Sequence, residues 1–203
     1  MKTRRSRWLK QLHLWHWVSS AICLVGLLLF TVTGVTLNHA ADIEGRPRVT
    51  TRDAQLPESL AAALSGGPHT GRGALPAAIA AWLSRELGVE LAGRDAEWSA
   101  GEAYVSLPRP GGDSWLTLAR PSGEVTYERT DRGWISYLND LHKGRNTGSV
   151  WRWFIDIFAG ACLVFAITGL VLLQLHSRNR PSTWPLVGLG LLAPLLLVLL
   201  FLH

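Results

Sequence analysis

The chain has 203 residues, of which 48% are hydrophobic, and carries a formal net charge of +5 at pH 7. This charge does not indicate a nucleic-acid-binding protein, because five Lys and Arg side chains lie among the first ten residues, directly before an apolar segment. The only two cysteines, Cys23 and Cys162, both lie in apolar segments, which excludes a disulfide framework or a CxxC redox centre. We interpret them as small packing residues.

Three apolar segments are each about twenty residues long, which is enough for a helix to cross a bilayer. Transmembrane helices are therefore predicted at residues 12–39, 150–176 and 184–203. The first follows a basic segment, as the apolar run of a signal peptide does, but this run is too long and no small-x-small cleavage site follows it. We expect it to remain as a membrane anchor, and the third helix to serve packing or homodimer formation.

Basic residues set the predicted orientation. Lys and Arg are concentrated in residues 1–11 and in the loop 177–183, so both segments are expected to be cytoplasmic. Residues 40–149 carry twelve Lys and Arg against fourteen Asp and Glu, and long loops cross largely regardless of charge. We therefore expect this region in the periplasm and the helices in a bacterial inner membrane.

The region between the first two helices predicts a small α+β domain at about residues 72–130. Before it, residues 42–53 are rich in charge and turn formers and are expected to be irregular. A short helix at 55–64 and a Gly/Pro-rich linker at 65–73 follow. A helix from residue 75 to Gly88 then has apolar residues at helical spacing. Four strand-like runs with intervening glycine turns complete an antiparallel sheet, at residues 96–99, 103–107, 115–118 and 124–129.

An amphipathic segment at residues 133–142 leads back to the second predicted transmembrane helix, and its Trp and Tyr are typical of a membrane interface. The dipeptides Thr33-Gly34 and Thr168-Gly169 recur in the first two transmembrane helices. Small residues at these positions allow a helix or a flat ligand to approach closely.

Histidines stand at the ends of the first two transmembrane helices, in two layers. His13, His16 and His176 lie toward the cytoplasm, whereas His39 and His142 lie toward the outside. Bis-histidine haem ligation requires two neutral imidazoles from opposite sides. These five residues are therefore the candidate cofactor-binding side chains, and His13, His39, His142 and His176 are the candidate axial ligands to haem iron. His13 and His16 share a helical face, and either is a candidate for the inner ligand.

Other interpretations of the histidines are weaker. Zinc or copper is less favoured, because neither layer offers a carboxylate or thiolate at ligand spacing. Histidines also occur at membrane boundaries without binding anything, and His69 is expected to be an exposed loop residue of this kind.

Three stretches resemble PepSY-associated transmembrane (PepSY-TM) proteins. HLWHWVSSAICLVGLLLFTVTGVTLNH resembles their first helix, LHKGRNTGSVWRWFIDIFAGACLVFAITGLVLL resembles their return helix, and ALPAAIAAWLSRELGVE with RPSGEVTYE is similar to the PepSY domain. Larger members are inner-membrane ferric-siderophore reductases that hold b-type haems between membrane histidines. The resemblance implies one or two haem b per chain, and it maps most directly onto His13, His39 and His142.

Our leading hypothesis is an α-helical membrane haem protein with oxidoreductase activity. It takes electrons from a quinone or a cytoplasmic reductase and passes them to a periplasmic ferric siderophore or partner protein. The alternative is a haem-free PepSY module, anchored in the bilayer, that binds a periplasmic partner or regulates a protease. The sequence has no Ser/His/Asp, Cys/His or HExxH constellation, so it does not indicate a peptidase.

Overall fold

The computed structural model describes residues 2–43, 45–91 and 93–202. Met1, the first residue of the predicted N-terminal segment, and His203, the last residue of the third predicted transmembrane helix, lie outside these ranges. The chain divides into two compact units. We call the described residues up to Leu29 and from Trp153 onward the helical unit, and the described residues between Phe30 and Arg152 the sheet unit.

Three long helices have the length and composition needed to cross a membrane. They are α1 (Lys2–Asn38), α5 (Gly148–His176) and α6 (Thr183–Phe201), with a 3-10 turn, η1 (Ser177–Asn179), after α5. The three predicted helices are therefore confirmed as helices. α1 begins earlier than predicted, because no Gly or Pro separates the basic segment from the apolar run. Most of their large apolar side chains are exposed, as on a surface that contacts lipid.

Small residues bring α1 and α5 together in the helical unit. Cys23 is fully buried, and its thiol lies within hydrogen-bonding reach of the thiol of Cys162. One turn further along α1, a Cβ built at Gly26 would overlap the ring of Phe158. These two pairs run antiparallel along the helices, and glycine at position 26 permits the close approach. The prediction that Cys23 is a small packing residue is confirmed.

The sheet unit contains a six-stranded antiparallel sheet in the order β1-β6-β5-β4-β3-β2. A helix, α4 (Trp134–Lys143), follows the last strand and matches the predicted amphipathic segment. The strands are β1 (Arg48–Gln55), β2 (Gly71–Ala74), β3 (Asp95–Trp98), β4 (Glu102–Ser106), β5 (Gly112–Ala119) and β6 (Glu124–Asp131).

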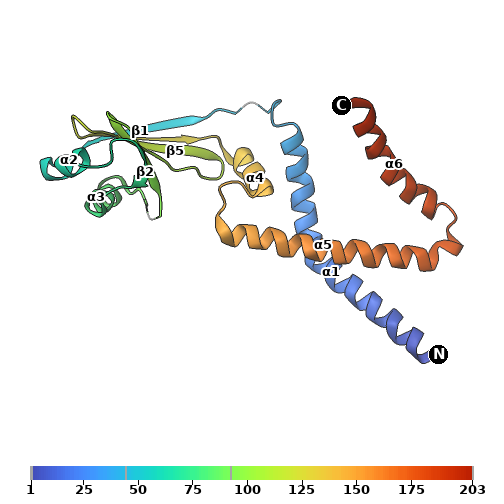
Figure 1. Ribbon diagram of the computed structural model, residues 1–203. Helices are drawn as coiled ribbons and strands as arrows, with labels where there is room; N and C mark the ends of the chain where they lie inside the picture. The colour runs from blue at the N-terminus through green and yellow to red at the C-terminus, as the bar shows by residue number, and fades with distance from the viewer. Residues whose placement is uncertain (1, 44, 92, 203) are drawn as a thin grey trace. The chain divides into compact units, whose positions relative to one another are not determined.

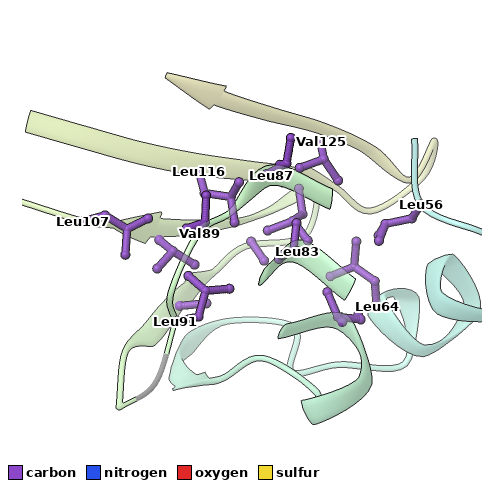
Figure 2. Close-up of a cluster of buried hydrophobic side chains, with 14 of the residues drawn as sticks. Leu56, Leu64, Leu83, Leu87, Val89, Leu91, Leu107, Leu116 and Val125 are labelled. Carbon is purple, nitrogen blue, oxygen red and sulfur yellow. The ribbon is translucent and has the colours of Figure 1, made fainter. Parts of the chain in front are cut away.

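The hydrophobic core lies between one face of this sheet and two helices, α2 (Glu58–Ser65) and α3 (Ala77–Leu87). Figure 1 labels both helices on the same side of the sheet. Figure 2 shows Leu83 and Leu87 of α3 beside Leu116 of β5 and Val125 of β6. The helical layer ends where Gly88 adopts a left-handed conformation with φ of 65°, which glycine tolerates at a helix C-terminus. The predicted helices and the four predicted strands of this region are confirmed within a few residues.

Two segments expected to be irregular are edge strands. Residues 48–55 form β1, which pairs along its whole length with β6, and residues 71–74 form β2, which pairs with β3. Neither segment alternates apolar and polar residues, so backbone pairing rather than side-chain burial places them in the sheet. The predicted linker is ordered by Arg120, 5% exposed, which donates hydrogen bonds to the carbonyls of Ser65, Gly67, Pro68 and Ser99.

The contact between Cys23 and Cys162 makes the helix pairing testable. Mild oxidation of the membrane-embedded chain is expected to join the two thiols, so that fragments cut between α1 and α5 by a protease stay linked on a non-reducing gel. Cys23→Ala is the control and should release the fragments. Separation of the wild-type fragments after oxidation, with both thiols still reactive toward a membrane-permeant maleimide, would contradict the pairing.

Candidate functional site

Two segments with the same spacing of Phe, Thr and Gly lie in α1 and α5. They are Phe30-x-x-Thr33-Gly34 and Phe165-x-x-Thr168-Gly169. Residues three and four apart lie on one side of a helix, so each segment presents a ring, a hydroxyl and a gap on the same face. The sequence indicated the two Thr-Gly pairs, but not that each phenylalanine lies against a histidine ring.

In the helical unit, the segment of α5 holds His16 of α1. The Nδ1 atom of His16 lies 3.0 Å from the hydroxyl oxygen of Thr168, which is itself buried. The imidazole stacks on Phe165, with ring centroids 4.8 Å apart and planes inclined by 17°. A Cβ at Gly169 would lie 3.4 Å from its Cε1 atom, in van der Waals contact, so Gly169 lies against a third side of the ring. His16 is thus fixed on three sides.

In the sheet unit, the segment of α1 holds His142 of α4 in the same way. The Nδ1 atom of His142 lies 2.7 Å from the hydroxyl oxygen of Thr33. The ring of Phe30 is 5.0 Å away and inclined by 48°, and a Cβ at Gly34 would lie 3.6 Å from Cε1. Each of the two units therefore contains one half-buried histidine with the same three kinds of neighbour.

The threonine hydroxyls favour one tautomer of each imidazole. Thr168 donates to the carbonyl of Val164 at 2.7 Å, and Thr33 donates to the carbonyl of Phe30 at 3.2 Å. Each hydroxyl oxygen then accepts a hydrogen bond from histidine Nδ1–H. The neutral imidazole consequently keeps a lone pair on Nε2, the atom through which a histidine can bind a metal.

The remaining predicted ligands lie in more exposed places. Nδ1 of His13 and Nδ1 of His176 are each 2.8 Å from the carbonyl four residues earlier, which likewise assigns the proton to Nδ1. His39 lies 3.2 Å from Asp42, and both side chains are exposed. No hydrogen bond or ring contact joins His39 to His142 within the described ranges.

One cavity of the helical unit brings two predicted ligands together. It has a volume of about 600 Å³, and both His16 and His176 line it. Gly169 and the apolar side chains of Leu172 and Leu173 form part of its wall, and Arg180 adds a cation. His13 instead lines a separate, more open hollow with Arg5 and Lys10. Among the described residues, no three His, Cys, Asp or Glu side chains converge as a metal-binding group.

Two polar residues of α4 that the sequence did not indicate hold His142 in place. Asn139, 8% exposed, accepts a hydrogen bond from the hydroxyl of Thr36 at 2.8 Å. Asp140, 2% exposed, accepts the backbone N–H of Gly111 at 2.8 Å and forms an ion pair with Arg145. These contacts attach α4 both to the end of α1 and to the loop before β5. The available signal in the sequence was a carboxylate, Asp140, within the amphipathic segment.

Comparisons with known proteins give one positive result. A family model described as "Putative PepSY_TM-like" matches residues 7–203. No curated protein and no solved structure matches the chain significantly.

The assigned tautomers can be tested by ¹⁵N NMR of histidine-labelled full chain in detergent, at a pH where the imidazoles are neutral. His16 and His142 are expected in the Nδ1–H form. Thr168→Val removes the acceptor for His16 and should shift its tautomer ratio about two- to tenfold toward Nε2–H, whereas Thr168→Ser should not. An identical ratio in Thr168→Val and wild type would contradict the assignment.

Proposed function

Because the chain belongs to the PepSY_TM-like family, we propose that it is a membrane b-type haem protein that transfers electrons to an acceptor outside the cytoplasm. The donor is a quinone or a cytoplasmic reductase, and the acceptor is a ferric siderophore or a partner protein. The observation that carries the proposal is the cavity lined by both His16 and His176. Haem, when bound, supplies one-electron iron chemistry that no amino-acid side chain of this site provides.

The side chains around this cavity fit a haem. Its volume of about 600 Å³ lies within the usual range of about 300–1,000 Å³ for cofactor pockets. Both imidazoles donate from Nδ1 to a protein oxygen, which leaves Nε2 of each able to bind iron. Leucine side chains supply an apolar wall, and the guanidinium of Arg180 suits the carboxylates that a haem carries. His16 and His176 are the residues that would hold the inner haem.

A second haem is proposed at His142, with His39 as the partner suggested by their positions near the outer ends of α1 and α4. His142 is the better defined of the two, because Thr33 fixes its Nδ1–H and leaves Nε2 available. Thr33 and Thr168 act as positioning residues, since they orient an imidazole without contacting the cofactor themselves.

The proposed haem sites predict which variants lose colour. His16→Ala and His142→Ala should each remove at least half of the haem per chain from the purified protein, measured by Soret absorbance and haem extraction. His176→Ala should convert the inner haem to a five-coordinate spectrum or remove it. His69→Ala, in an exposed loop, is the control and should keep the wild-type spectrum.

Colourless wild-type protein, purified from cells supplied with haem and with its sheet unit folded, would overturn the proposal. That result would favour the haem-free alternative, in which the sheet unit binds a periplasmic partner or regulates a protease.

We further propose that α1, α5 and α6 span a bacterial inner membrane with the N-terminus in the cytoplasm, as the basic flanks favour. In a background without Cys23 and Cys162, a membrane-impermeant maleimide should label Ser84→Cys, on α3, in cells with a permeabilised outer membrane. Ser6→Cys should be labelled only after the inner membrane is opened. The reverse pattern would contradict the orientation.

A further inference from the structure

An arginine-rich hollow lies on the helix-covered face of the sheet, beyond the end of α3. Its volume is about 730 Å³, and Leu87 and Gly88 form one side of it. We call it the arginine hollow and define it by four cations that line it, Arg46, Arg48, Arg52 and Arg129. The hollow exists because the helical layer stops at Gly88 while β1 and β6 continue past it.

Strand register places three of these arginines together. Side chains alternate along a strand, so Arg48, Thr50 and Arg52 of β1 share one face. Thr50 pairs with Arg129 of β6, which makes Arg129 the diagonal neighbour of both Arg48 and Arg52. Diagonal pairs lie about 7–8 Å apart, within reach of long side chains. Three guanidinium groups therefore surround one point on the sheet.

Asp131, which lies opposite Arg48 on β6 and interacts electrostatically with Arg129, offsets these positive charges only in part. In the parts of the chain that the structure describes, none of the four guanidinium groups forms an ion pair with a carboxylate. Asp53 lies on the opposite face of β1, where it accepts a hydrogen bond from Thr126. Clustered like charges raise the free energy of the folded protein, and a bound anion would remove that cost.

Asp131, which also lines the hollow, is already engaged. Arg109 donates to it at 2.8 Å and the backbone N–H of Gly133 donates at 2.8 Å. The hydrogen bond from Arg109, followed by that from Gly133, holds the pKa of Asp131 below its usual value, so the carboxylate stays charged and paired with Arg109. Four arginines and one carboxylate leave a lining charge of +3.

We propose that the arginine hollow binds a small molecule that carries two or more carboxylate or phosphate groups. Guanidinium forks match the two oxygens of such groups, and several forks around one point select a ligand with several anionic groups. The ring of Tyr127 and the side chain of Leu87 supply apolar surface for the carbon skeleton. This site lies within the sheet unit and does not depend on haem.

Calorimetric titration of the full chain in detergent with citrate, and separately with pyrophosphate, tests the site. One molecule per chain should bind, with an affinity that falls as salt concentration rises. Arg52→Gln and Arg129→Gln should each weaken binding at least about tenfold, because each removes a charge-assisted pair. Arg129→Lys, which keeps the charge but loses the fork, should weaken binding less than Arg129→Gln.

Arg85→Gln is the matched control. Arg85 is exposed on α3 and does not line the hollow, so its loss changes the net charge equally and should leave the affinity unchanged. Circular dichroism confirms that each variant is folded. Equal binding by wild type, Arg52→Gln and Arg129→Gln, or equal weakening by Arg85→Gln, would overturn the proposal.

A lipid headgroup presents the same phosphate chemistry as a free ligand. The titration is therefore repeated in nanodiscs of phosphatidylcholine, with and without phosphatidylglycerol. Citrate or pyrophosphate binding that phosphatidylglycerol leaves intact assigns a soluble ligand. Loss of that binding in nanodiscs that contain phosphatidylglycerol assigns a lipid headgroup to the same arginines, and Arg129→Gln should then bind neither probe in either kind of nanodisc. No binding of citrate or pyrophosphate by the wild type in any medium refutes the site.

Discussion

The contact between a threonine hydroxyl and a histidine Nδ1 is the interaction on which both halves of the candidate site depend, and a hydroxyl that donates to a helix carbonyl favours accepting from that nitrogen. Thr168 and Thr33 each meet an imidazole nitrogen in this way, at 3.0 and 2.7 Å. The threonine thereby fixes both the orientation and the tautomer of the ring. The phenylalanine one turn earlier supports a face of the ring, and the following glycine leaves it room.

The position of His142 also depends on the folded sheet. Asp140, two residues earlier on α4, is buried and bonded to the backbone of Gly111, which adopts a φ of 73° in the loop before β5. A non-glycine residue at 111 would be strained and would contact Tyr137 of α4. The sheet thus acts as a support that fixes α4 and its histidine, which gives a physical reason for a sheet domain between two membrane helices.

Much of this organisation could be predicted from the sequence, since apolar runs and glycine turns report directly on helices and strands. β1 could not be predicted, because RVTTRDAQ has no apolar alternation and is held by pairing with β6. The candidate histidines were identifiable by type and place, but the preference for His16 over His13 in the inner cavity required the partners Thr168 and Phe165, over 140 residues away. Long-range neighbours of this kind leave no local signal.

Electron paramagnetic resonance of the oxidised wild-type protein tests the central claim most directly, because it reports the atoms that bind the iron. The account predicts a low-spin ferric signal typical of two imidazole ligands, which His16→Ala diminishes. The positioning role of Thr168 predicts a shifted or broadened signal in Thr168→Val. A high-spin signal in the wild type, or haem-loaded protein whose signal is unchanged by His16→Ala and His142→Ala, would contradict it.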